Sequence, residues 1–284
     1  VRFENVRGRL LAGGASSGPT ATRPARPFGR FNLTAGAYRE QQGGQFHATV
    51  ALEDVDLGNL PATGPVGAAA GAIREALHPA GRCDAEIEIR ATRGEPARVR
   101  GTATLRDVSV RLRAFPHPVT RLSGTVAFDR QEASLDVTGT PAGGGTLHCD
   151  GTVALGDRRG SYNLSLRAED IAIGETLGEA MHAAQLGAVW RDIRPAGAAT
   201  IDLALAREAG TPWPAAELTL HPSRRGPLRV RHRFFPYPVS VVGGTITIRD
   251  NDVHIPAPFE RRPGVDGEIR AVAGGATFLL YGRI

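Results

Sequence analysis

Lysine is absent from the sequence, so all 34 basic residues are arginines, as coding bias in a GC-rich genome would produce. The 29 acidic residues are interspersed among them, the formal net charge is only +5, and no block of five or six like charges occurs. Nucleic-acid binding needs clustered positive charge to meet the phosphates. Although the sequence pI is about 10.0, the charge pattern argues against a nucleic-acid partner and favours an ordinary solvated surface.

Cysteine is nearly as scarce. Cys83 and Cys149 are too few for a disulfide framework, and no CxxC pair points to a metal or redox site. Each falls at an inward position of a segment that alternates apolar and polar residues, so we expect two buried thiols. A single bridge between them in an oxidising compartment stays open, because sequence spacing does not say whether the two sulfurs meet.

Catalytic and metal-binding motifs are also missing. The eight histidines are scattered, without an HxH or HExxH pattern or a paired carboxylate neighbour. GxSxG is absent, and the glycine run at 143–145 matches neither a phosphate-binding loop nor a dinucleotide fingerprint. The sequence therefore predicts no catalytic residue, no cofactor and no bound metal, in a protein that is not an enzyme.

Long apolar runs do not occur. No stretch of about 18 apolar residues could form a membrane-spanning helix, and no signal peptide is visible. The chain starts at Val1 rather than at a methionine and ends in TFLLYGRI, which resembles the middle of a strand. We therefore expect a segment of a longer protein.

What the sequence does contain is glycine, proline and short alternating segments. Its 36 glycines and 20 prolines, with 6% aromatic residues and one methionine, suit strands joined by turns better than packed helices. Apolar residues occupy every second position in many segments, for example Phe46, Ala48, Val50 and Leu52. This alternation predicts a mainly β fold of antiparallel strands, each with one apolar and one solvated face.

A repeat organises these segments. FPHPVTRLSGTV at 115–126 returns as FPYPVSVVGGTI at 235–246, an offset of 235 − 115 = 120 residues. Upstream, 46–58 matches 162–174 at an offset of 162 − 46 = 116 residues. The difference fits an insertion of four residues in the turn HPSRRGPL, because turns tolerate insertion. The shared signature consists of Phe115, Pro116, Pro118 and Gly124 in the first copy and Phe235, Pro236, Pro238 and Gly244 in the second.

The repeat divides the chain into three parts. Residues 1–45 are expected to be the tail of a preceding unit, residues 46–161 the first complete unit and residues 162–284 the second. Helical spacing predicts a helix over about 175–193 and a less regular counterpart over about 66–77, which glycine interrupts. Such helices most often cover an apolar sheet face.

The proline-rich signature has a structural explanation. Pro116 and Pro118 fix the backbone and remove two hydrogen-bond donors, so we expect an extended approach to the sheet and a strand that begins near Val119. Gly124 and Gly244 predict a bulge or bend in each copy.

The order of these motifs resembles the AsmA-like superfamily of bacterial envelope proteins, which includes TamB. The pattern is D-(I/V)-x-(L/I)-G, then an optional helix, then P-x-G, then F-P-(H/Y)-P-V, and it covers residues 46–284. The resemblance implies an elongated, curved antiparallel sheet whose apolar groove carries phospholipid or another acyl lipid in outer-membrane biogenesis. It also implies a periplasmic location, with an inner-membrane anchor outside these residues.

Three interpretations stay open, because alternation alone does not separate an open groove from a closed sandwich core. In the favoured one, the chain holds or conducts lipid, and the lining candidates are Val126, Phe128, Leu135, Ile246, Ile248 and Ile255. In the second, it is a structural or assembly module of the envelope that binds partner proteins through sheet edges. In the third, a polysaccharide-acting enzyme would need carboxylates about 5 to 10 Å apart, but the repeat chiefly aligns Asp54 with Asp170, which we expect at helix N-termini.

Overall fold

The computed structural model describes a defined set of residues in the chain. They are residues 2–3, 6–11, 27–39, 44–59, 74, 77–113, 115–155, 160–183, 190–191, 194–211, 215–231, 237–249, 252–255, 269–273, 276–280 and 282–283. Within them the fold is mainly β, with antiparallel strands in a curved, unclosed sheet and a single α-helix. The predicted fold class, a curved antiparallel sheet with one or two short helices, is confirmed. No helix in this part of the chain is long and apolar enough to cross a membrane.

The chain divides into two compact units, whose bounds differ from those of the two sequence repeats; below, "unit" means one of these compact units and "copy" means one of the sequence repeats. The first comprises Val1–Arg113, Arg121–Val137 and Leu155–Asp157, and the second comprises Ala114–Thr120, Thr138–Ala154 and Arg158–Ile284. Strands β7 (Val119–Phe128) and β8 (Glu132–Pro141) contribute residues to both units. The strand β7 begins at Val119, as the proline spacing predicted.

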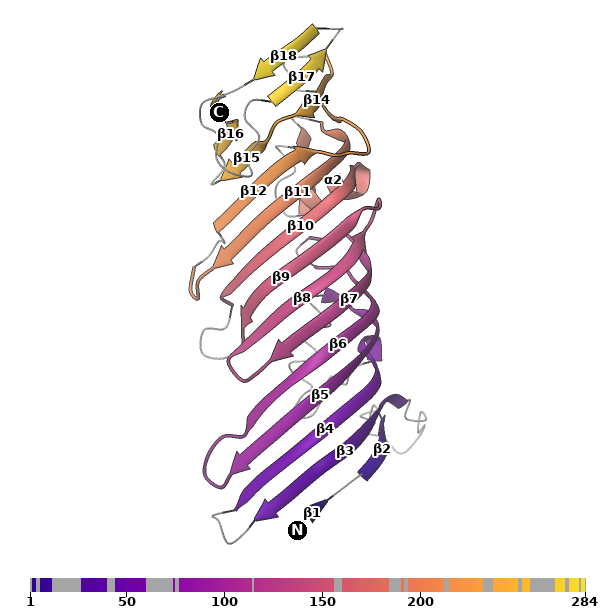
Figure 1. Cartoon of the computed structure of the whole chain (residues 1–284), viewed down its shortest axis with the longest axis vertical. Helices are drawn as coiled ribbons and strands as arrows, with labels where there is room; N and C mark the ends of the chain where they lie inside the picture. Colours follow the sequence, from indigo (N-terminus) through magenta and orange to yellow (C-terminus); the bar gives the residue numbers. More distant parts are fainter. Residues whose placement is uncertain are drawn as a thin grey trace, which may run out of the picture. The chain divides into compact units, whose positions relative to one another are not determined.

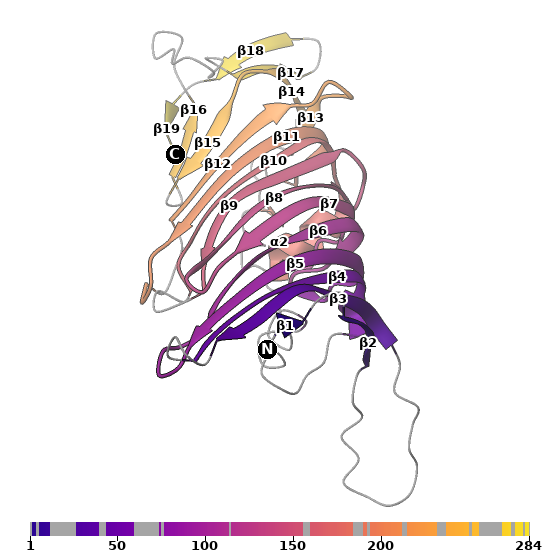
Figure 2. The same ribbon diagram turned by 60° about the horizontal axis from the view of Figure 1, so that its bottom comes forward.

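The first unit is built from long strands that pair in chain order (Figure 1). Its elements are β1 (Arg2–Phe3), β2 (Val6–Leu11), β3 (Pro27–Arg39), β4 (Gln45–Asp56), the 3-10 turn η2 (Leu57–Asn59), β5 (Ala80–Thr92) and β6 (Arg98–Val110). Antiparallel pairing joins β2, β3, β4, β5 and β6, and β1 also pairs with β3. These strands bend along their length, so the sheet is curved (Figure 2).

The second unit starts with the same pattern and then divides. Its elements are β9 (Thr146–Ala154), β10 (Tyr162–Ile173), α2 (Glu175–Ala183), β11 (Ala196–Arg207), β12 (Ala215–Pro222), β13 (Leu228–Val230), β14 (Val239–Gly243), β15 (Ile246–Arg249), β16 (Asp252–Ile255), β17 (Ile269–Ala273), β18 (Ala276–Leu280) and β19 (Gly282–Arg283). Strand β10 pairs with β9 and β11. Beyond β11 one branch runs through β12, β15, β16 and β19, and the other through β13, β14, β17 and β18.

The four-residue insertion predicted in HPSRRGPL lies where this division starts. Strand β12 ends at Pro222, an isolated bridge joins Ser223 to Gly226, and β13 begins at Leu228. The corresponding strand of the first unit, β6, runs without a break. The insertion therefore forms a turn that separates β12 from β13.

A β-bulge recurs at equivalent positions of the two copies. On β4 the pairing steps from Leu52 to Val55, and on β10 from Ala168 to Ile171, which is the same place after an offset of 168 − 52 = 116. The extra residues have positive φ, 58° at Asp54 and 53° at Asp170. Asp tolerates this left-handed backbone better than most residues.

The prediction that this aligned aspartate pair lies at helix N-termini is therefore wrong. Asp54 and Asp170 both lie inside strands, where a short side chain is needed at a bulge with positive φ.

The segments that precede β5 and β11 also end alike. The amide of His78 donates to the carbonyl of Arg74, and the amide of Arg194 donates to the carbonyl of Trp190, each at 2.9 Å. His78 and Arg194 have φ of 41° and 37°, the left-handed conformation that commonly terminates a helix. Proline follows at both places and stops the helix from continuing.

The predicted helices can be compared with this ending. The helix predicted over 175–193 begins at Glu175 and is described to Ala183, and residues 190–191 are again helical. Of the helix predicted over 66–77, only residues 74 and 77 are described, and both are helical. The rest of that prediction lies outside the described residues.

Candidate functional site

The apolar face of the first unit consists of rows of side chains that run across the strands. Strand register places Leu33 opposite Val50, Val50 opposite Ile87, and Ile87 opposite Gly101. Each of these residues is half-buried, neither sealed from water nor fully exposed. Because the opposite positions on the same strands carry polar and charged residues, this face is one continuous apolar surface.

Three of the predicted lining residues belong to the first unit. Val126, Phe128 and Leu135 alternate with exposed residues on β7 and β8, and all three are half-buried. A Cβ built on Gly101 would lie 2.9 Å from Cζ of Phe128, so the aromatic ring lies directly against this glycine. Gly101 therefore gives the ring a place on the sheet that any larger residue would occupy.

The second unit has a corresponding face. A row of half-buried residues crosses four strands, because Cys149 pairs with Leu166, Leu166 with Leu203, and Leu203 with Leu218. Leu166, Leu203 and Leu218 were not among the predicted lining residues. Alternation in these segments was the available signal, but only the register shows that the leucines form a single row.

The other three predicted lining residues lie in the second unit. Ile246 is half-buried and packs against the core cluster of this unit. Position 248 pairs with Leu218 and position 255 pairs with Gly282 in the strand register. The side chains of Ile248 and Ile255 lie outside the described residues. The structure therefore divides the six candidates between two units.

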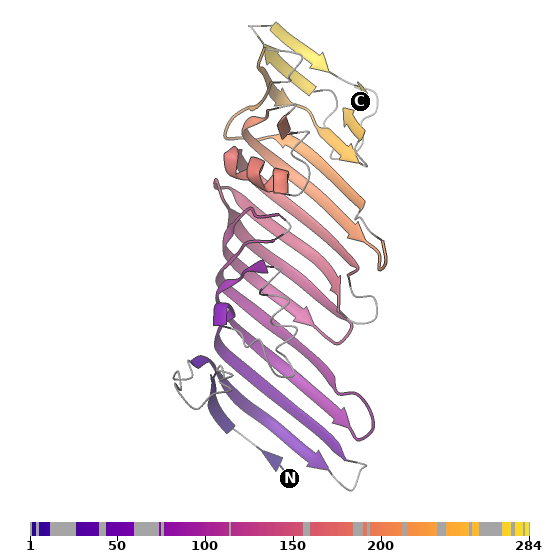
Figure 3. The same ribbon diagram turned by 180° about the vertical axis from the view of Figure 1, so that it is seen from behind.

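Helix α2 covers one end of the apolar face in the second unit (Figure 3). Leu177 of the helix is buried, and so are Ile171, Ile173 and Ala199 of the strands beneath it. Trp190 and Met181 pack against the same cluster. The face is thus closed under the helix, while the leucine row farther along the strands stays half-buried.

The repeat signature lies at this closed end. Phe115 packs against the core cluster, and His117 is 7% exposed, with no hydrogen-bond partner for its Nδ1 atom among the described residues. Burial lowers the pKa of His117, and hydrogen bonds to the backbone of Thr176 and Ala142 oppose this shift. The half-buried Pro116 and Pro118 flank His117 and precede β7. In this copy the signature packs against the core directly before the first residue of β7.

The two copies of the repeat signature lie differently in the sheet. Gly124 lies within β7 at φ 142°, whereas Gly244, at φ 92°, lies in the break between β14 and β15. Pro238 is exposed, and Phe235 and Pro236 lie outside the described residues.

The polar face of the first unit carries an ionic cluster centred on Glu88. Its carboxylate is 18% exposed and lies 2.5 Å from Arg90 Nη2 and 3.0 Å from His47 Nε2, and it also accepts a hydrogen bond from Arg100 Nε. The arginines and the histidine lower the pKa of Glu88 to about 2, against the opposing effect of burial. Glu88 is therefore ionised at neutral pH and stays ionised to a lower pH than an ordinary glutamate.

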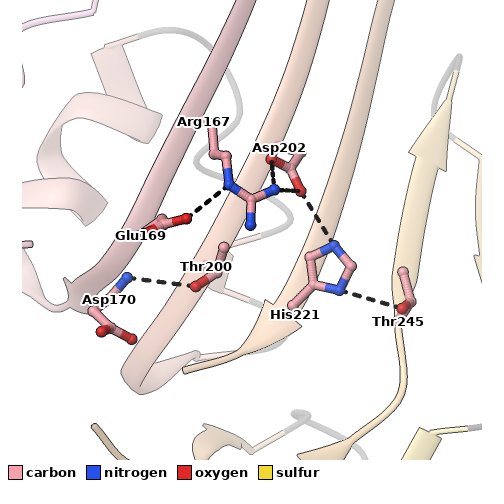
Figure 4. A network of polar contacts seen from close by, with 7 residues as sticks. All are labelled: Arg167, Glu169, Asp170, Thr200, Asp202, His221 and Thr245. Carbon is pink, nitrogen blue, oxygen red and sulfur yellow. Dashed lines mark hydrogen bonds and ion pairs between the residues drawn. The ribbon is translucent and has the colours of Figure 1, made fainter. Parts of the chain in front are cut away.

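The polar face of the second unit carries a chain of contacts across three strands (Figure 4). Arg167 binds both oxygens of Asp202, at 2.9 and 3.2 Å. His221 Nε2 lies 3.3 Å from Asp202 Oδ2, and His221 Nδ1 lies 3.3 Å from Thr245 Oγ1. Since a carboxylate only accepts, Nε2–H donates to Asp202, and in the tautomer that carries its single proton on Nε2 the Nδ1 atom accepts from the threonine hydroxyl.

This hydroxyl, imidazole and carboxylate follow the order of a catalytic triad, but the arrangement does not suit catalysis. Thr245 is 0% exposed, so its hydroxyl does not reach a substrate. Arg167 also engages the carboxylate that would orient the imidazole. The contacts instead tie β10, β11 and β12 to the segment before β15.

The bulge aspartates are held differently in the two copies. Asp54 pairs with Arg82 at 2.6 Å, whereas Asp170 accepts from Ser223 Oγ at 2.5 Å and from the Arg224 amide at 3.2 Å. The Ser223 hydroxyl is the main cause that lowers the pKa of Asp170. The inserted turn thus supplies a partner where the second copy has Ala198 in place of Arg82.

The cysteines occupy the apolar faces. Cys83 is buried, but Cys149 is only half-buried, which corrects the expectation of two buried thiols, because Cys149 lies on a part of the face that no described helix covers. Both thiols are free. Burial raises the pKa of Cys149 to about 11. No group of three or more metal-ligating side chains occurs in the described part of the chain.

Comparisons of the chain with protein-family models, with curated proteins and with solved structures found no match.

Proposed function

We propose that the apolar face of each unit holds the acyl chains of lipids, and that the chain is a non-enzymatic, lipid-holding or lipid-conducting segment of a bacterial envelope protein. The observation that carries this proposal is the half-buried state of the apolar rows, such as Leu166, Leu203 and Leu218. A face this apolar gains free energy when a partner other than water covers it.

The chemistry of the face suits lipid tails. The rows that cross the strands carry alkyl and small side chains, and the charged residues lie on the opposite face. Burial of about ten methylene groups is worth roughly 8 kcal/mol before the cost of immobilising the lipid. Such a face would hold a chain without a directed polar contact.

The resemblance to the AsmA-like superfamily supports the same proposal. It implies a periplasmic location, with an inner-membrane anchor outside these residues and a role in holding or conducting phospholipid or another acyl lipid between membranes. The curved, unclosed sheet is the fold that this resemblance implied.

The proposal is tested by native mass spectrometry and lipid extraction after expression in a bacterial periplasm. The wild-type segment should carry phospholipid. Val126→Asp, combined with Leu203→Asp, should abolish this, because a carboxylate on each apolar face opposes the binding of a hydrocarbon chain.

A matched control uses the opposite face of the same two strands. Thr125 and Ala204 are exposed and neighbour Val126 on β7 and Leu203 on β11, so Thr125→Asp combined with Ala204→Asp adds the same charge on the solvated side. This control should keep its lipid. A folded wild-type segment that carries no lipid, even when supplied with it, would contradict the proposal and favour an assembly module of the envelope.

A further inference from the structure

Three basic residues form a row on the polar face of the first unit. His47 of β4 pairs with Arg90 of β5, and Arg90 pairs with Arg98 of β6. Like charges directly opposite one another destabilise a sheet. The row therefore has a cost that the fold would avoid unless the charges serve another purpose.

The second copy shows that the fold does not need these charges. The equivalent row there is Asn163, Ala206 and Ala215, in the same register on β10, β11 and β12. The offsets of the first two positions are 163 − 47 = 116 and 206 − 90 = 116. The same backbone thus forms with no charge at any of the three positions.

The carboxylates that the described part of the chain brings to the row do not neutralise it. Glu88 contacts Arg90 and His47, but it also binds Arg100. Arg98 is exposed and pairs with no carboxylate among the described residues. The single negative charge of Glu88 is shared among its partners, so the positive charge of the two arginines in the row is not balanced by it.

A hollow of about 510 Å³ lies beside the row, at the end of the strands next to the β5–β6 hairpin. His47, Arg90 and Arg98 line it, and among the described lining residues Glu95 is the one acidic residue. Phe46 and Ala91, which belong to the apolar face, also border it. Gln45 and Thr92 add side chains that can hydrogen-bond to an oxyanion.

We propose that this hollow is a phosphate-binding site, in which Arg90, Arg98 and His47 bind the phosphate group of a lipid whose chains lie on the apolar face. Arginine presents several donors in a planar fork that fits phosphate oxygens. The assignment of the phosphate to a lipid headgroup rests on the proposed function, whereas the phosphate site itself does not.

The test replaces the row with the residues that the second copy uses. The variant His47→Asn, Arg90→Ala, Arg98→Ala should fold, because the second copy tolerates this row. Circular dichroism and the urea midpoint check this. Titration calorimetry with inorganic phosphate, and co-sedimentation with vesicles of phosphatidylglycerol or of phosphatidylcholine, then measure binding by the full chain at low salt.

The wild type should bind inorganic phosphate and prefer the phosphatidylglycerol vesicles. Each arginine removed should weaken vesicle binding about fivefold. A folded triple variant that binds both probes as the wild type does would overturn the site. Phosphate binding that the variant loses, without any vesicle preference, would support the site and overturn its assignment to a lipid.

Failure of this inference is distinguishable from failure of the proposed function. Loss of phosphate binding in a variant that still co-purifies with acyl lipid would show that the two faces act independently. Arg207→Ala, at the corresponding end of β11, is a control arginine outside the row and should leave both measurements unchanged.

Discussion

The half-buried state of the leucine row leads to a prediction that separates stability from binding. Leu203 lies in the open row of the second unit, and Leu228 is 4% exposed in the core beneath α2. Truncation of a buried leucine to alanine costs about 2 to 5 kcal/mol, because the lost burial is joined by a cavity. We therefore expect Leu228→Ala to lower the free energy of unfolding by about 3 kcal/mol.

Leu203→Ala should behave differently. Its side chain already touches water, so its removal forfeits about half of the burial energy and leaves no closed cavity, which corresponds to about 1 kcal/mol. When an acyl chain covers the row, the same three carbons become fully buried. Their loss should then weaken lipid binding by about 1 to 2 kcal/mol, roughly five- to thirtyfold.

The assay is urea unfolding of the lipid-free chain, followed by far-UV circular dichroism, together with titration of a fluorescent fatty acid. Leu228→Ala should shift the unfolding midpoint strongly, and Leu203→Ala should mainly reduce fatty-acid affinity. If Leu203→Ala costs the lipid-free chain as much stability as Leu228→Ala, the leucine row is covered in solution by another part of the protein, and the open face that the proposed function requires does not exist.

Three further predictions concern acid, thiol chemistry and backbone. The folded pKa of Glu88 is about 2, below its ordinary 4.5. Its ionised form therefore stabilises the chain above about pH 4.5, and this contribution is lost as the pH falls towards 2. Glu88→Gln should make the urea midpoint less dependent on pH over this range and should lower the midpoint at pH 7. Cys149, with a pKa of about 11, should react with iodoacetamide about tenfold faster for each pH unit between 8 and 10 in a Cys83→Ala background, and bound fatty acid should slow the reaction. Gly124→Ala should destabilise by more than about 2 kcal/mol, because its Cβ would lie 2.2 Å from the Asp136 carbonyl oxygen at a φ of 142°; Gly174→Ala, with open space around it, is the control and should be nearly neutral in the same urea titration.

The strands and their faces could be predicted because alternation is a local property. Phe46, Ala48, Val50 and Leu52 share one face of β4, and each pairs with a β5 residue of the same face. The bulge also left a local signal, since the apolar spacing changes from two to three between Leu52 and Val55. Short-range steric rules therefore account for most of the sheet.

Whether a face is covered could not be predicted, because coverage depends on long-range packing. Ile246 and Leu203 both alternate in their segments, yet Ile246 packs against the core cluster beneath α2 while Leu203 stays in the open row. The basic row was hidden for a similar reason. His47 is far from Arg90 and Arg98 along the chain, and only strand register places the three side chains in one row.

The two copies of the repeat show which residues the fold requires. The bulge aspartate is kept in both copies, although its partner changes from Arg82 to Ser223 and the Arg224 amide. The donor to this carboxylate comes from a strand in the first copy and from the inserted turn in the second. By the same comparison, the basic row of His47, Arg90 and Arg98 is not required, because Asn163, Ala206 and Ala215 replace it without a change of register. Residues that keep their role in both copies therefore report on folding, and a charged row that only one copy carries is where a function separate from folding should be sought.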